Sequence, residues 1–176
     1  VLYSPRKQGA GLVDALAATT SSVYPTVKGA SEVSRPKADL GDGTTGWHFD
    51  VVLHNLSDAE ATYELGSQAL SEIVDGGFFK EHSSDWRGRG VAVSYSGAAS
   101  GAGEGATVTV PAGGEAMVGV DIAPGSEFAQ YVADNVPSGT FLDGFVRFTS
   151  RTETQPSLTV PYLGFYGDWG KPAIFD

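Results

Sequence analysis

The chain contains no cysteine among its 176 residues. Disulfide bonds, thiolate metal sites and a cysteine nucleophile are therefore excluded. Long apolar runs are also missing, because no stretch approaches the roughly 20 residues that span a membrane. Charged residues are few, at 18 %, whereas hydrophobic residues make up 41 %. A chain of this length and composition is not disordered and can bury a real core, most simply as one domain.

Positive charge is scarce as well: 11 lysines and arginines face 21 acidic residues, for a formal net charge of −10. An acidic surface repels phosphate backbones and anionic lipids, so we expect no nucleic-acid binding and no membrane contact by this chain. The charge serves solubility, or it steers basic substrates toward a neighbouring site. No charged-then-apolar leader is present and the first residue is Val1, which leads us to expect a fragment or a processed piece.

Glycine and proline are abundant, at 24 and 9 residues, which indicates many turns. Apolar and polar residues alternate in "GWHFDVVLHN", and "TYELGSQ" follows a turn, so we predict a hairpin over Trp47–Leu65. A second predicted hairpin joins Ala106–Val110 to Glu115–Ile122 through a turn at 111–114. Other strands are expected at 69–74, 91–96, 140–150 and 157–167. Seven or eight short strands without βαβ alternation predict an all-β, antiparallel β-sandwich.

Helical spacing is limited to two short segments. Residues 12–17 predict a helix of about two turns, which needs a partner surface because such a helix is marginal alone in water. Phe128, Tyr131 and Val132 lie at i, i+3, i+4 spacing and predict a second helix. Two stretches are expected to be elaborations: 76–90, which has no clean period, and 96–106, a low-complexity flexible loop.

The sequence contains little evidence for a catalytic or metal site. The histidines are His48, His54 and His82, and the first two lie about 20 Å apart along an extended strand, too far to act on one atom. No G-x-S-x-G elbow and no zinc-ligand spacing occurs. Segment 39–46, "DLGDGTTG", departs from the calcium-loop pattern and is interpreted as a tight turn. We therefore assign no catalytic residue, no metal ligand and no cofactor.

The C-terminal stretch 160–176 is dense in aromatic residues, namely Tyr162, Phe165, Tyr166, Trp169 and Phe175. Such rings can form a carbohydrate platform, but the interspersed Gly164, Gly167 and Gly170 favour packing of the backbone close to another surface. We interpret 160–165 as the last core strand and 166–176 as the exit toward a following domain. Tyr162, Tyr166 and Trp169 are the candidate interdomain or substrate-exosite surface.

Both ends of the chain carry family motifs. The segment "SPRKQGAGLVDALAA" resembles the end of a subtilisin-like protease catalytic domain, in which a proline and a Q-G-A-G-x-[IV]-[DN] stretch lead into the final helix. The matching positions are Pro5, Gln8, Gly9, Ala10, Gly11, Leu12, Val13 and Asp14. The resemblance implies that residues 1–20 are the tail of such a domain.

Residues 21–176 resemble the fibronectin type III-like domain that follows the catalytic domain in cell-envelope subtilases of the lactocepin and streptococcal complement-peptidase kind. The strand–turn motifs match at Leu53, Asn55, Ser57, Thr62, Tyr63, Val108, Val110, Pro111, Ala112 and Gly113. The two most specific motifs match at Gly139, Phe141, Leu142, Asp143, Gly144, Phe145, Val146 and Phe148, and at Pro161, Tyr162, Gly164, Phe165, Gly167, Asp168 and Trp169. Structural roles are expected for Asn55, Tyr63, Gly144, Phe145, Pro161, Gly164, Phe165 and Gly167.

The resemblance implies a non-catalytic accessory domain of an exported, cell-wall-associated serine endopeptidase. Its partners would be the catalytic domain, the following domains of the same polypeptide, and protein or peptide substrates. The catalytic motifs and the wall-sorting signal of the family are missing from this sequence, so we expect the protease to lie upstream and any anchor downstream. The alternative from another class is an autonomous adhesion or carbohydrate-binding β-sandwich module.

Overall fold

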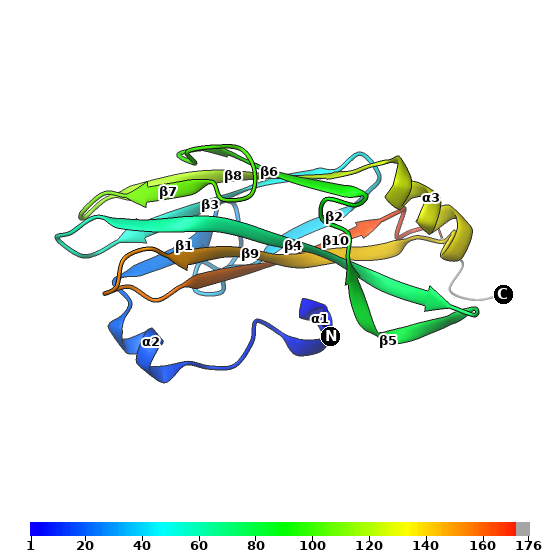
Figure 1. Ribbon diagram of the computed structural model, residues 1–176, viewed down its shortest axis with the longest axis horizontal. Helices are drawn as coiled ribbons and strands as arrows, with labels where there is room; N and C mark the ends of the chain where they lie inside the picture. The colour runs from blue at the N-terminus through cyan, green and yellow to red at the C-terminus, as the bar shows by residue number, and fades with distance from the viewer. Residues whose placement is uncertain (172–176) are drawn as a thin grey trace.

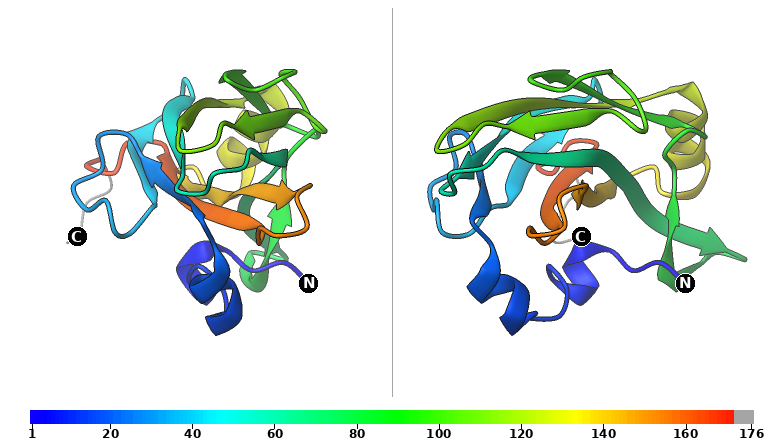
Figure 2. Two further views of the ribbon diagram at one scale, coloured as in Figure 1. Left: turned by 90° about the vertical axis from the view of Figure 1, so that its left-hand side faces the viewer. Right: turned by 60° about the vertical axis from the view of Figure 1, so that its left-hand side comes forward.

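The computed structural model describes residues 1–171 and consists of two β-sheets packed face to face, with three short helices (Figures 1 and 2). The elements are α1 (Pro5–Gln8), α2 (Ala15–Thr20), β1 (Val23–Val27), β2 (Ala38–Gly43), β3 (Trp47–Asn55), β4 (Ala61–Asp75), β5 (Phe78–Asp85), β6 (Val91–Gly97), β7 (Thr107–Val110), β8 (Glu115–Pro124), α3 (Ser126–Asn135), β9 (Thr140–Ser150) and β10 (Leu158–Tyr166). One sheet has the strand order β1-β3-β8-β6, and the other the order β2-β10-β9-β4-β5 with β7 paired to β4. The predicted β-sandwich is confirmed.

Strand β3 shows how the alternation of the sequence produces the core. Phe49, Val51 and Leu53 are buried, whereas His48 and His54 point away from the second sheet. Burying one apolar face of each sheet is what removes the strands' hydrophobic side chains from water. The buried residues of both sheets form one cluster between the layers.

Both predicted hairpins are wrong, although their strands exist. Strand β3 pairs with β1 and β8, whereas β4 pairs with β9, β5 and β7 in the other sheet. Likewise β7 pairs with β4, and β8 with β3 and β6. The turns between them are corners that cross from one sheet to the other. Because both sheets point their apolar faces at the same core, alternation alone does not distinguish a corner from a hairpin.

Two predicted non-strand segments also contain strands. The 39–46 segment, interpreted as a tight turn, overlaps β2, which pairs in parallel with β10. The 76–90 elaboration contains β5, which extends a hairpin with β4 through Gly76 and Gly77. By contrast, the predicted loop at 96–106 contains no regular element beyond the end of β6. That loop folds back onto β6, where the Tyr95 amide donates a 2.9 Å hydrogen bond to the Ala102 carbonyl.

The helices occupy the ends and one outer face of the sandwich. The predicted helix around Phe128 is confirmed as α3, with Phe128 and Val132 buried. The predicted helix at 12–17 is displaced to α2, where the Asp14 side chain accepts a hydrogen bond from the Ala17 amide and caps the first turn. Helix α1 lies against the outer side of β9 and β10, as Figure 1 shows.

Candidate functional site

The three residues of the predicted surface occupy three different environments. Tyr162 is 1 % exposed and belongs to the core, where its hydroxyl donates a hydrogen bond of 2.6 Å to the Gln68 carbonyl. Burial raises the pKa of the Tyr162 hydroxyl well above its ordinary value. Placing Tyr162 on an interdomain surface was therefore wrong. The residue lies on the inward face of β10, and the motif did not reveal which face that is.

Tyr166 and Trp169 follow at the end of the same strand. The Tyr166 ring is half-buried and packs edge-on against Phe128 of α3, with ring centroids 5.2 Å apart. Trp169 is 62 % exposed. Trp169 is thus the most exposed member of the predicted trio, whereas Phe175 lies outside the described residues.

Trp169 belongs to an aromatic cluster on the outer face of the six-stranded sheet. Its ring centroid lies 4.8 Å from that of Phe165 and 5.4 Å from that of Phe141. The guanidinium of Arg6 lies 4.0 Å above the Phe141 ring centroid, a cation–π arrangement. The N-terminal segment and the C-terminal aromatic residues therefore meet on one face of the sandwich.

The N-terminal segment is attached to that face through Asp143, a fully buried residue of β9. Its Oδ2 accepts hydrogen bonds from the Ser4 hydroxyl and, at 2.7 Å, from Arg6 Nε. Burial raises the pKa of the Asp143 carboxyl, and the bonds from Ser4 and Arg6 oppose that rise. A buried carboxylate needs such partners, because burying it unpaired would destabilise the folded state. We call Ser4, Arg6 and Asp143 the N-terminal anchor.

The anchor is extended by Glu72 of β4. Arg6 forms a 3.0 Å ion pair with Glu72, and the Thr140 hydroxyl donates to the same carboxylate at 2.6 Å. Leu70 and Phe145 are buried on this outer face although they lie outside the main core cluster. The N-terminal segment lies on this same face, where α1 contacts β9 and β10. The anchor was not predicted from the sequence, where its one signal is an acidic residue in the otherwise apolar strand "FLDGFVRF".

Beyond the anchor, the N-terminal segment presents apolar side chains to solvent. Leu12, Val13 and Leu16 are 102 %, 92 % and 73 % exposed, and α2 buries none of its residues. A second exposed apolar pair, Phe78 and Phe79, lies at the tip of the β4–β5 hairpin. Large apolar side chains exposed together to solvent are typical of a surface that contacts another domain or protein.

The glycine and asparagine positions of the family motifs have clear structural roles. A Cβ on Gly144 would lie 2.0 Å from the Gln68 carbonyl oxygen, and one on Gly164 would lie 3.1 Å from the Trp47 ring. The Asn55 side chain donates to the Val110 and Pro111 carbonyls and so joins the β3–β4 corner to the end of β7. A side chain at Gly144 would thus collide with the backbone of β4, and one at Gly164 would press on the Trp47 ring.

The remaining motif residues also support the sandwich. Tyr63 is fully buried, and burial raises its pKa to about 12. Pro161 lies in β10 opposite Phe145. At Gly167 the backbone has φ 145°, and a Cβ there would lie 3.0 Å from the Phe165 ring. These positions set the path of β10 and of the turn that carries Trp169.

Two of the three histidines, His48 and His54, form acid–histidine pairs on the outer face of the four-stranded sheet, whereas His82 is exposed on β5 of the other sheet. His48 is held between two carboxylates, with Nδ1 2.8 Å from Asp121 and Nε2 3.2 Å from Asp50. The hydrogen bond with Asp121 is the largest of the effects that raise the pKa of His48. Both ring nitrogens of His54 are similarly engaged, by Thr26 and Glu115. Neither ring has a nitrogen that faces a serine hydroxyl, so these histidines do not form the base of a serine triad.

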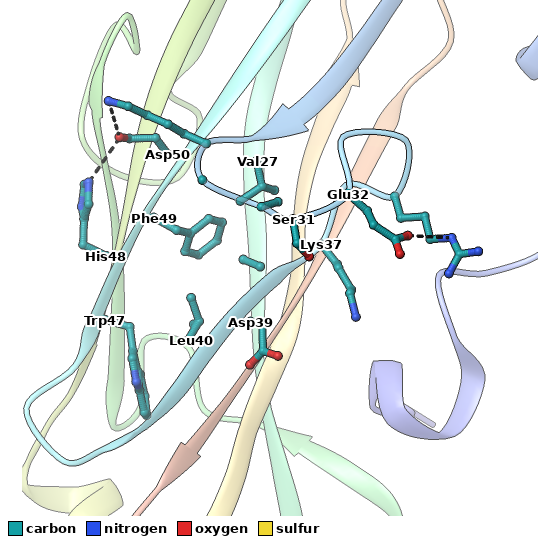
Figure 3. Close-up of a pocket in the computed structure, with 15 residues that line it drawn as sticks. Val27, Ser31, Glu32, Lys37, Asp39, Leu40, Trp47, His48, Phe49 and Asp50 are labelled. Carbon is teal, nitrogen blue, oxygen red and sulfur yellow. Dashed lines mark hydrogen bonds and ion pairs between the residues drawn. The ribbon is translucent and has the colours of Figure 1, made fainter.

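A hollow of about 650 Å³ lies beside this face, between the 28–37 loop and strands β2 and β3 (Figure 3). Phe49 and Leu40 form part of its apolar floor, and the Lys28–Asp50 and Glu32–Arg35 ion pairs lie on its rim. Charges of both signs neutralise each other there. The hollow therefore shows no preference for a ligand of one charge, and the described residues place no nucleophile–base pair in it.

Within 1–171, no group of three or more histidine and acidic side chains could hold a metal ion. None of the three helices is long and apolar enough to cross a membrane, as far as the chain is described.

Two stacked, mainly antiparallel sheets with corner connections define the class as an immunoglobulin-like or fibronectin type III-like β-sandwich. The chain belongs to the Fn3-like domain family, whose family model matches residues 39–163. A C5a peptidase of Streptococcus pyogenes is 30 % identical over 174 residues, covering 96 % of this chain and 13 % of that protein. A PII-type proteinase of Lactococcus lactis subsp. cremoris is 30 % identical over 180 residues, covering 100 % of this chain and 8 % of that protein.

These relatives confirm the resemblance inferred from the motifs, and the chain spans only a small part of their length. Among solved structures, a family 123 glycoside hydrolase from Clostridium perfringens superposes with a TM-score of 0.50 at 8 % identity. The match covers 86 % of this chain and 28 % of the hydrolase. At that identity the likeness concerns the fold alone.

Proposed function

We propose that this chain is a non-catalytic accessory domain of an exported, cell-envelope subtilisin-like serine endopeptidase. Residues 1–20 would be the tail of the catalytic domain, and residues 21–176 the Fn3-like domain that supports it. The observation that carries the proposal is the state of the N-terminal segment. It begins at a buried anchor on the sandwich and continues into Leu12, Val13 and Leu16, whose exposed side chains have no cover within the described chain.

This arrangement fits a structural role in which the segment joins the sandwich to the catalytic domain. The anchor fixes the segment to the sheet, and the apolar side chains of α2 would pack into the preceding catalytic domain. The match to proteinases over nearly the whole chain supports this interpretation. The exposed Trp169 and the Phe78–Phe79 tip are the surfaces available for contact with a protein substrate or a following domain.

Two measurements test the proposal. The purified chain should not hydrolyse casein or fluorogenic peptides, with or without a serine-protease inhibitor. Inhibitor-sensitive turnover that remains with the chain through purification would overturn the non-catalytic assignment. The coding sequence directly upstream should contain a catalytic serine segment in the same reading frame, and an upstream frame that encodes an unrelated domain would contradict the assignment to a protease.

One observation favours the alternative of a carbohydrate-binding module, namely the exposure of Trp169. A sugar platform needs coplanar exposed rings, whereas Trp169 is inclined at 87° to Phe165 and at 53° to Phe141. Saturable glycan binding that Trp169→Ala abolishes would support this alternative; a glycan array without signal would favour the accessory-domain role.

A further inference from the structure

A small hollow of about 270 Å³ opens beside Trp169 on the outer face of the six-stranded sheet. We call it the Trp169 hollow, and its main lining residues are Asp39, Asp42, Phe141, Leu163, Phe165 and Trp169. Three of these are the mutually packed rings of the aromatic cluster, whose centroids lie 4.8 to 5.4 Å apart. Ligand pockets for drug-sized molecules start near ~300 Å³, so this hollow is suited to a single side chain.

The exposed ring is held by its own backbone turn. The Trp169 amide donates a 2.8 Å hydrogen bond to Asp42, and the Gly170 amide donates to Asp168 at 2.9 Å. The Gly167 amide donates to the Gly43 carbonyl at 3.2 Å, which joins the turn to the end of β2. These bonds hold the backbone that carries Trp169, and its ring packs against Phe165 and Phe141. A surface held in this way loses little conformational entropy on binding.

The rim of the hollow is acidic. In the parallel pairing of β2 with β10, Asp39 lies beside Leu163 and Asp42 beside Phe165, which places both carboxylates next to the aromatic residues. Neither carboxylate is part of an ion pair within residues 1–171, and both residues are exposed. The face of an aromatic ring carries partial negative charge. Rings and carboxylates together thus favour a cation.

The same cluster already binds one cation within the chain. The Arg6 guanidinium lies over Phe141, the ring that also contacts Phe165 and Trp169. Arg6 is retained there by Asp143 and Glu72, so its charge is compensated on the anchor side and not by Asp39 or Asp42. The Trp169 side of the cluster repeats this chemistry, with an aromatic face beside carboxylates, and lacks the guanidinium.

We propose that the Trp169 hollow binds the side chain of an arginine or lysine from another polypeptide, with the charged head between Asp39 and Asp42 and the stem along Trp169. If the proposed function holds, this site is the substrate-contacting surface of the accessory domain, and it selects basic segments. The binding itself is a property of the chain and stands or falls independently of the peptidase assay.

The experiment is an NMR titration of the complete chain at low ionic strength. The probe is a blocked Gly-Arg-Gly-Arg-Gly peptide, and its counterpart carries glutamate in place of arginine. The indole N–H signal of Trp169 is assigned by its loss in Trp169→Phe. We expect this signal to shift saturably with the arginine peptide only. Asp39→Asn combined with Asp42→Asn should weaken binding about tenfold, because exposed cation–π contacts and ion pairs are each weak but act together here.

The matched control removes the same charge elsewhere. Asp58→Asn with Glu60→Gln takes two exposed carboxylates from the β3–β4 corner and should leave the affinity within twofold of the unaltered chain. Asn at position 42 retains a side-chain oxygen for the Trp169 amide, so the turn should persist, which unchanged amide shifts at 167–170 would verify. An equal loss in the control pair, an equal response to the glutamate peptide, or no saturable shift at Trp169 would each overturn the proposal.

Discussion

Arg6 and Asp143 are 137 positions apart in the sequence, and Nε of the first lies 2.7 Å from Oδ2 of the second. The carboxylate is fully buried in β9, whereas the guanidinium is 23 % exposed and covers it from the N-terminal segment. This one pair connects the N-terminal segment to the middle of the Fn3-like sandwich. Loss of either partner therefore affects both parts.

Arg6→Ala should destabilise the chain by about 2 kcal/mol, below the cost of breaking a fully buried pair because Arg6 keeps some contact with water. The reason is that Asp143 would remain buried with only Ser4 as a partner. Urea denaturation of the purified chain measures the change. The control is Arg35→Ala, whose pair with Glu32 is exposed on both sides and should contribute no more than about 0.5 kcal/mol. Equal changes in the free energy of unfolding for the two substitutions would show that the anchor stabilises the chain no more than an exposed ion pair does.

Gly144→Val should cost about 3 kcal/mol, because its Cβ would overlap the Gln68 carbonyl and force two paired strands apart. The hydrogen bond from Tyr162 to that carbonyl would be disturbed as well. Gly66→Val in β4 is the matched control, since a Cβ there meets no atom within 4 Å. Melting temperatures of the two variants distinguish overpacking from a general intolerance of valine. An unchanged melting temperature for Gly144→Val would contradict the close approach.

Asn55→Ala should destabilise the chain by about 2 kcal/mol, because buried carbonyl groups at the corner lose their donor. Its side-chain amide serves Ala59, Val110 and Pro111, and its oxygen accepts from the Ser57 amide. Asn135→Ala, at the exposed end of α3, provides the comparison and should cost well under 1 kcal/mol. A similar free-energy change in both variants would argue against a special role for the β3–β4 corner.

The pairing of His48 with Asp121 and Asp50 should make stability depend on pH. The folded pKa of His48 is raised above its ordinary value of 6.5, so its contribution is complete below that pH and is lost as the pH rises through the folded pKa. The ring is half exposed and Lys28 also pairs with Asp50, so the contribution should stay under about 1 kcal/mol.

Urea midpoints of the unaltered chain and of His48→Asn at pH 5.5 and 8.5 provide the measurement. The difference between the two proteins should be larger at pH 5.5. Comparison at each pH cancels the contributions of other groups, including Asp143. A larger difference at pH 8.5 would reverse the sign and contradict the assignment.

The sequence alone was sufficient to predict several features of this protein. Alternation in segments such as 47–55 identified strands, because one face of each strand must be apolar to enter a core. The motifs at both ends identified the family. The helical spacing of Phe128 and Val132 identified α3. These inferences rest on neighbouring residues, and local pattern carries that information.

Strand pairing, by contrast, was decided only by the folded structure. The stretch around β3 and β4 has the same alternating pattern whether the two strands pair or lie in opposite sheets, because either arrangement points the apolar face at the shared core. The aromatic motif at the end of the chain likewise did not predict that Tyr162 faces the core whereas Trp169 is exposed to solvent.

The anchor is the clearest case of this division. The sequence places the basic residue Arg6 in a short segment at the start of the chain and Asp143 in an otherwise apolar strand. Their contact depends on long-range packing that brings the first turn of the chain onto the outer face of β9. A buried carboxylate is stable only where the fold places a hydrogen-bonding or positively charged partner beside it, and only the tertiary structure determines that placement.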